Sequence, residues 1–163
     1  MVVKGWRIDM KSRILMLALA AGALGAAVCL AQDPNLGTWK RNEAKSKMPA
    51  GLSQNNTVVM EAAGDNIKVT MDGTDKDGKP THSEWTGKFD GNDYPVTGNP
   101  NVDSRSYKKI DDHKMETTNK KDGKVVLTAQ VEISKDGKTR TVHVIQTDSA
   151  GKKVTGKAVF EKQ

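Results

Sequence analysis

The feature that most constrains this chain is a tight turn that recurs between runs of alternating apolar and polar residues. Asp-Gly-Lys occurs at 77–79, 122–124 and 136–138, and Asp-Gly without the lysine is a variant of this turn at 90–91. Asp-Gly supplies the positive φ angles that two-residue hairpins require. The chain is therefore predicted to fold as strands joined by short hairpins.

The segments between the turns have the period of two that marks strands with one buried face. Over residues 125–133 the odd positions are all apolar, whereas the even positions include Thr128, Gln130 and Glu132. Only the stretch 43–54 lacks this rhythm. The turn spacing predicts about ten strands, which begin near Leu36, Thr57, Asn66, Thr81, Tyr94, Ser104, Lys114, Val125, Thr139 and Val154.

Consecutive hairpins give an all-β fold, an antiparallel up-and-down meander of about 8–10 strands. A twisted meander of this size protects its edge strands best by closing on itself. A closed or flattened β-barrel is therefore the first choice, and a two-sheet sandwich is the alternative.

The amino-terminal segment has the composition of an export signal. Four basic residues precede an uncharged apolar run over residues 14–30. Small residues end the run before the polar Gln32, a pattern typical of a signal peptide that is cleaved after Ala31. Residues 1–31 are thus predicted to form a cleaved signal helix, which leaves 32–163 as a single β-barrel domain that is secreted or periplasmic.

Other interpretations of this segment stay open. The run approaches the roughly 18 apolar residues that let a helix span a bilayer, so an uncleaved anchor is the rival. Cys29 would be a lipid attachment site if Val28 were accepted before it, and translation could also begin at Met10. With cleavage after Ala31 the mature chain has no cysteine and no membrane span, so its core and its hydrogen bonds must hold it together.

Charges are spread along the whole chain. The net charge of +6 falls to +3 once residues 1–31 are removed. No basic block is interleaved with aromatic residues, so the composition indicates a solvated surface and argues against nucleic-acid binding. We expect a monomer.

The first predicted strand resembles the opening of a known group of barrels. Leu36-Gly37-Thr38-Trp39-Lys40 is similar to the Gly-x-Trp opening of lipocalins and to the Gly-Thr-Trp-Lys opening of fatty-acid-binding proteins. Both are calycins, antiparallel barrels of eight or ten strands. In those families the tryptophan closes one end of the barrel, and a basic residue of the last strand packs across it. The resemblance implies these structural roles for Trp39 and for Lys157, with Lys162 as the less favoured choice.

Two departures separate the chain from fatty-acid-binding proteins. The stretch 43–54 is too short for their helical lid, and the last predicted strand lacks their Arg-x-Tyr carboxylate grip. The mature chain is also similar to small uncharacterised secreted bacterial proteins, which implies a compartment and no activity.

Three arginines stand out against nineteen lysines after residue 31. Each shares strand parity with apolar or aromatic neighbours, and side chains two apart face the same side of a strand. Arginine suits bidentate recognition of a carboxylate or phosphate better than lysine does. A small amphiphilic or anionic ligand would fit such a face, although arginines that cap barrel ends with buried alkyl stems would give the same pattern. The candidate ligand-binding residues are Arg41, Trp85, Phe89, Arg105, Tyr107, Leu127 and Arg140.

No catalytic or metal-binding motif is recognisable. His82 and Glu84 lie two apart on one strand face, but opposite to Trp85 and Phe89, so inward aromatic rings would leave both facing solvent. A metal would still lack a third ligand, and no serine lies in a Gly-x-Ser-x-Gly elbow. We expect no enzyme activity, no cofactor and no metal.

Two functions lead from the sequence, ahead of an enzyme as the third class. The first is a secreted calycin-like binding protein for a small apolar or anionic ligand. The alternative is a secreted or periplasmic interaction module, an inhibitor or envelope-associated protein, with no internal ligand. An interior cavity of about 300 Å³ or more would favour the first, and a filled interior would favour the second.

Overall fold

The computed structural model describes residues 33–49, 52–75, 77–147 and 151–163. The signal helix predicted for residues 1–31, and Cys29 with it, lies outside this description. The described residues contain strands and turns, and among them no helix is long and apolar enough to cross a membrane.

Ten strands follow one another along the described chain, each starting within about three residues of its predicted position. Local alternation and turn chemistry were therefore sufficient to place them. The strands are β1 (Gly37–Arg41), β2 (Gln54–Ala63), β3 (Asn66–Thr74), β4 (Pro80–Gly87), β5 (Tyr94–Thr97), β6 (Ser104–Lys109), β7 (Lys114–Lys121), β8 (Lys124–Ile133), β9 (Thr139–Thr147) and β10 (Lys153–Lys162).

The turn between β7 and β8 shows why Asp-Gly recurs. Asp122 and Gly123 have φ angles of 50° and 72°, and a two-residue type I′ turn needs positive φ at both central positions. Aspartate tolerates this region better than most residues, and glycine adopts it freely. Lys121 consequently pairs with Lys124, and the dipeptide fixes the start of the hairpin register.

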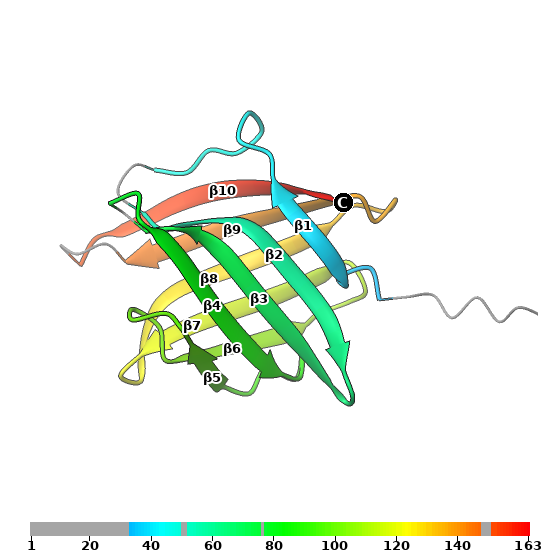
Figure 1. Ribbon diagram of the computed structural model, residues 1–163, viewed down its shortest axis with the longest axis horizontal. Coiled ribbons are helices and arrows are strands. Elements are labelled where there is room, and N and C mark those ends of the chain that lie inside the picture. Colours follow the sequence, from blue (N-terminus) through cyan, green and yellow to red (C-terminus); the bar gives the residue numbers. More distant parts are fainter. Residues whose placement is uncertain (1–32, 50–51, 76, 148–150) are drawn as a thin grey trace, which may run out of the picture. The chain divides into compact units, whose positions relative to one another are not determined.

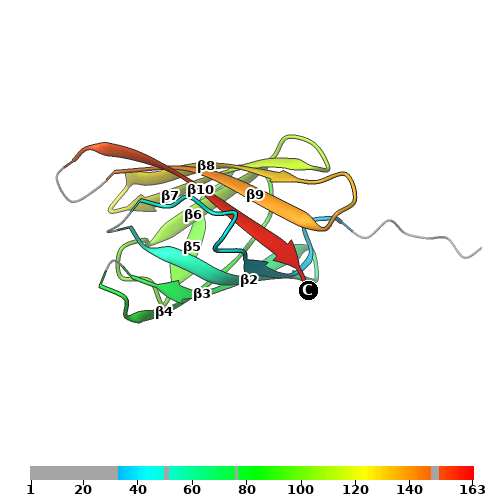
Figure 2. The same ribbon diagram turned by 90° about the horizontal axis from the view of Figure 1, so that it is seen from above.

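The sheet closes into a barrel because the first strand pairs with the last. β1 lies between β2 and β10, with Trp39 opposite Val58 on one side and opposite Lys162 on the other. Strands β2–β4 form one wall, and β7–β10 form the wall that faces it (Figure 1, Figure 2). The closed up-and-down barrel confirms the predicted fold class and excludes the two-sheet sandwich.

Alternate residues of each strand point into the barrel, as the period of two predicts. In β8, Ala129, Val131 and Ile133 are buried, whereas Gln130 and Glu132 between them are exposed. Burial of an apolar side chain stabilises the fold by about 1.5–3 kcal/mol for a residue of the size of valine or isoleucine. The inward rows therefore form the core, and strand parity decides which side chains can meet inside.

Where β1 ends, the chain leaves the barrel wall and then returns to it. Residues 42–46 form an excursion, after which Lys47 pairs with β10. Glu161 holds this excursion, because its Oε1 accepts hydrogen bonds from Asn42 Nδ2 at 3.0 Å and from Lys45 Nζ at 2.9 Å. The excursion accounts for part of the stretch in which the strand rhythm of the sequence breaks.

Candidate ligand site inside the barrel

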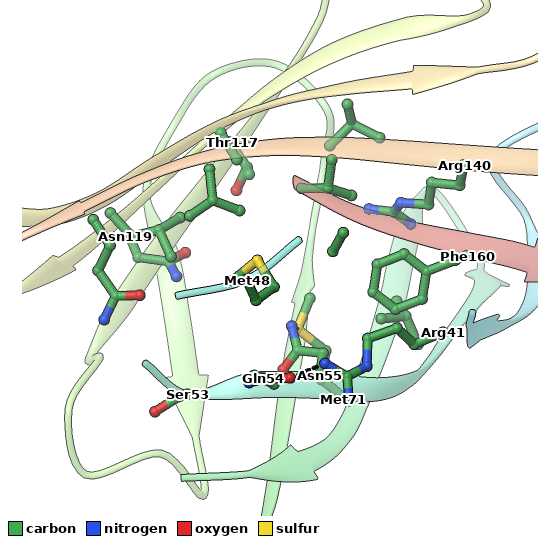
Figure 3. Close-up of a pocket in the computed structure, with 18 of the residues that line it drawn as sticks. Arg41, Met48, Ser53, Gln54, Asn55, Met71, Thr117, Asn119, Arg140 and Phe160 are labelled. Carbon is green, nitrogen blue, oxygen red and sulfur yellow. Dashed lines mark hydrogen bonds between the residues drawn. The ribbon is translucent and has the colours of Figure 1, made fainter. Parts of the chain in front are cut away.

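The interior of the barrel holds a cavity of about 100 Å³. Arg41, Arg105 and Arg140 all line it, although they come from β1, β6 and β9. Figure 3 shows Arg140 and Arg41 on either side of Phe160, as the pairing of β9, β10 and β1 requires. Strand parity thus brings all the arginines of the described chain to one place.

The rest of the cavity wall is largely apolar. This volume of about 100 Å³ lies below the 300 Å³ or so typical of drug-sized ligands. None of the described residues that line the cavity is acidic. Besides the arginines, the lining comprises Met48, Ser53, Gln54, Asn55, Val58, Met71, Tyr107, Thr117, Asn119, Leu127, Ala129, Val131, Val142, Val144, Gln146, Ala158 and Phe160.

Arg105 is buried on β6, with 5% of its surface exposed. Its Nε donates a hydrogen bond to Asn119 Oδ1 at 2.7 Å, and its Nη1 lies 3.1 Å from Met71 Sδ, a weak acceptor. Its Cζ lies 5.9 Å from the ring centroid of Tyr107, within range of a cation–π interaction. Asn119 stands directly opposite Arg105 in the β6–β7 pair, so the register creates this contact. All three partners are neutral.

Arg140 is buried even more deeply on β9, with 3% exposure. Its Nη1 lies 3.2 Å from Met60 Sδ, and its Nε has no hydrogen-bond partner. Burial lowers the pKa of the guanidinium, the neighbouring Tyr107 hydroxyl opposes this shift, and the charge of Arg105 adds to it. Arginine remains a cation in proteins. The barrel therefore encloses a charge whose described partners are neutral.

Arg41 lies closer to solvent than the other two arginines, with 11% of its side chain exposed. Its Nη1 donates to Gln54 Oε1, and its Nη2 lies 3.1 Å from Oε1 of Glu43, a side chain that is 83% exposed. Arg41 Nε has no partner. This arginine is thus paired with a solvent-exposed carboxylate, which distinguishes it from Arg105 and Arg140.

Four aromatic rings form a packed cluster next to the cavity. Trp85 makes edge contacts with Tyr107 and Tyr94 at centroid distances of 4.9 and 5.7 Å, and Phe89 lies 5.5 Å from Tyr107. Tyr107 and Leu127 line the cavity, but Trp85 and Phe89 do not. Five of the seven predicted ligand residues therefore meet at the cavity, and the other two pack against their neighbours instead.

Trp39 is completely buried, and its Nε1 donates to the Asn35 carbonyl at 2.9 Å. The basic residue across its ring is Lys162, whose Nζ lies 5.0 Å from the ring centroid. Lys162 pairs with Trp39 in the β1–β10 register, whereas Lys157 falls on the opposite parity of β10 and is exposed. The prediction that Lys157 packs on Trp39 is therefore wrong, and Lys162 takes that position.

Sequence reasoning missed several residues beside the arginines. Thr117 and Asn119 of β7 line the cavity, and Thr117 Oγ1 is buried without a hydrogen-bond partner. Both share parity with the buried Met115, so polar residues at inward positions were the available signal. Met60 and Met71 gave no such signal, because an inward methionine is ordinary core.

The outer surface carries the residues considered for a metal or acid–base site. His82 and Glu84 lie on the face of β4 opposite to the buried Trp85, as expected. His82 Nδ1 lies 2.7 Å from Asp72 Oδ1, and Glu84 Oε1 lies 2.7 Å from Lys68 Nζ. Within the described ranges, no group of three or more histidine, cysteine, aspartate or glutamate side chains is placed to hold a metal ion.

Comparison with known proteins adds no residue roles. No protein-family model matches the chain, and no curated protein matches it significantly. The closed ten-stranded antiparallel barrel is consistent with a calycin-like barrel. This likeness depends on the topology and on the contact between Trp39 and Lys162.

Proposed function

We propose that the protein is a calycin-like binding protein that holds one small anionic, partly apolar ligand inside its barrel. The observation behind this is the pair of buried cations, Arg105 and Arg140, which face a cavity without an acidic residue in its described lining. Burial of a charge without a counter-charge is costly, several kcal/mol in real proteins. A ligand anion would provide the missing charge.

The apolar wall and the cavity volume define the rest of the ligand. Val131, Val144 and Phe160 offer contact to a short alkyl group. About 100 Å³ favours a ligand of a few non-hydrogen atoms over a long-chain amphiphile. The cavity is smaller than the 300 Å³ or so that would favour a carrier of a larger ligand, so the proposal depends on the buried arginines and is restricted to small anions.

The proposed setting is outside the cytoplasm, either secreted or periplasmic, with the protein acting as a monomer. The basic and apolar composition of residues 1–31 supports this setting.

Isothermal titration calorimetry of the purified protein with acetate, butyrate, phosphate and a long-chain fatty acid tests the proposal. We expect saturable binding of one or more of the small anions and none of the long-chain acid. Arg105→Met and Arg140→Met should each weaken binding about ten- to a hundredfold, because each removes a charge-assisted hydrogen bond. Lys40→Met is the matched control, since Lys40 lies next to Arg41 on β1 but is exposed.

Unchanged affinity in both arginine variants would refute the roles given to Arg105 and Arg140. Binding by the long-chain acid alone would contradict the small size of the ligand. Failure of the whole panel to bind would refute an internal anion.

A groove of about 710 Å³ over β7–β10 favours a second candidate, an interaction module that works from its outer face. Glu116, Gln130, His143 and Lys157 form one cross-strand row in this groove. If no small anion binds inside the barrel, this function becomes the better proposal.

A further inference from the structure

The cavity wall carries more positive charge than one monovalent anion can neutralise. Of the three guanidinium groups, only that of Arg41 contacts an acid, Glu43, within the described residues. Arg105 and Arg140 instead contact Asn119 and the thioether sulfurs of two methionines. Two positive charges in the wall are thus left without a described counter-charge.

These two cations lie near one another around a single tyrosine. Arg105 Cζ lies 5.9 Å from the centroid of the Tyr107 ring, and Tyr107 lines the same cavity as Arg140. Arg105 is also close enough for its charge to lower the pKa of Arg140. Like charges in a low-dielectric interior repel each other strongly. A negative group near Tyr107 would be attracted by both.

Unpaired polar atoms at the cavity provide an independent observation. Arg41 Nε, Arg140 Nε and Thr117 Oγ1 are all buried and lack hydrogen-bond partners, and all three residues line the cavity. Such atoms are rare in native structures. A carboxylate offers two acceptor oxygens, whereas a phosphate-like group offers three. The three unpaired donors match the three acceptor oxygens of a phosphate-like group.

We infer, on the basis of the proposed function, that the ligand is a compact dianion: a phosphate-like group with a short alkyl substituent. One such group would neutralise both Arg105 and Arg140. A monocarboxylate would leave one of them uncompensated, and a cavity of about 100 Å³, well below the size typical of drug-sized ligands, favours one small anion over two.

Methylphosphonate and methanesulfonate test this, because they share one shape and differ by one charge at a pH where the phosphonate is doubly ionised. In calorimetric titrations at constant ionic strength, the purified protein should bind methylphosphonate at least about tenfold more tightly. Malonate carries the same two charges on separate carboxylates, and it should bind more weakly than methylphosphonate. Tighter binding of malonate would overturn the assignment of a single compact group.

Variants of Arg105 and Arg140 then show whether these two residues recognise the second negative charge of methylphosphonate. Arg105→Met and Arg140→Met should each reduce the preference for methylphosphonate over methanesulfonate to near parity. Lys40→Met, an exposed change on β1, should keep the preference of the wild type. Near-ultraviolet circular dichroism of each variant establishes that its barrel is intact.

These titrations distinguish failure of the dianion proposal from failure of the proposed small-anion function. Equal binding of both anions by the wild type, or a preference that both arginine variants retain, would overturn the dianion and leave a small-anion function standing. Failure of methylphosphonate, methanesulfonate and acetate to bind would overturn both.

Discussion

Trp85 and Arg140 face into the same barrel, but their surroundings are of opposite kinds. Around Trp85, aromatic rings meet at centroid distances of 4.9 to 6.3 Å, and the indole Nε1 donates to the Arg105 carbonyl at 2.8 Å. Around Arg140 there is a cavity, an unpaired Nε and a charge without a described counter-ion. One region has its packing and polar groups satisfied, and the other does not.

This difference indicates that stability and binding depend on separate parts of the interior. The aromatic cluster lowers the free energy of the folded state by burying large rings. The buried charges of the arginine region raise the free energy of the folded state, and a bound anion would offset this increase. Tyr107 belongs to both regions, since its ring packs on Trp85 and the residue also lines the cavity together with Arg105 and Arg140.

The largest expected effect is the loss of an aromatic anchor. Trp85→Ala should lower the free energy of unfolding by about 3–5 kcal/mol, because it empties a site that is 1% exposed. Trp39→Ala should cost a similar amount, which is a large part of the 5–15 kcal/mol typical of a small domain. Urea denaturation measures both. A loss under about 1 kcal/mol for Trp85→Ala would mean that the cluster is not a main source of stability.

The second prediction is an increase in the free energy of unfolding when a buried arginine is replaced. Arg140→Met, measured by urea denaturation without added anions, should raise the free energy of unfolding by about 1–3 kcal/mol, because it removes a buried cation and keeps a side chain of similar length. Arg41→Met is the comparison variant and should change stability less, since Arg41 is partly solvated and paired with Glu43. Destabilisation by Arg140→Met would contradict the view that the arginine region destabilises the fold while the aromatic cluster stabilises it.

Tyr107→Phe separates the two roles of one residue. The ring remains, so the tryptophan bands of the near-ultraviolet circular dichroism spectrum should be largely preserved, and only the tyrosine band should decrease. Loss of the hydroxyl, which opposes the lowering of the Arg140 pKa, should change the free energy of unfolding by only about 0.5–1.5 kcal/mol. If Tyr107→Phe lowered the free energy of unfolding as much as Trp85→Ala does, Tyr107 would act as part of the aromatic cluster alone.

The smallest effect concerns the chain excursion at residues 42–46. Hydrogen bonds from Lys45 and Asn42 lower the pKa of Glu161 below its ordinary value of 4.5. A carboxyl group with a depressed folded pKa adds stability that is present above its unfolded pKa and is lost as the pH falls through the folded one. Glu161→Gln should therefore lower the melting temperature slightly at neutral pH and not at acid pH.

A double variant provides the control for this last effect. In a Lys45→Met background, the hydrogen bond that contributes most to the lowered pKa of Glu161 is absent, so Glu161→Gln should change the melting temperature less. A melting-temperature difference between wild type and Glu161→Gln that persists unchanged into acid would show that the charge of Glu161 is not its source.

Local chemistry made the fold predictable, whereas the site depended on contacts between distant strands. Asp122-Gly123 and the alternation in β8 specify a hairpin without reference to the rest of the chain. Parity alone placed Arg105 and Arg140 inside. Which residues lie beside them depends on register and on the spacing of the walls, and these depend on the whole barrel.

The same limit explains the two differences from the predicted site. Lys162 rather than Lys157 meets Trp39 because the β1–β10 register pairs them, and no local pattern encodes that register. Trp85 and Phe89 were expected to touch a ligand, but rings from β4 and its flanking loop pack on Tyr107 of β6 once the barrel closes.

The pairing of β1 with β10 also has a consequence for synthesis. The barrel cannot close until its last strand has emerged, so β1 must wait with an open edge while the intervening strands are made. Contacts between residues so far apart in sequence slow folding toward the millisecond-to-second range. Unpaired edges also invite association with other chains during that time. A chain truncated before β10 would therefore be an aggregation-prone open sheet rather than a smaller barrel.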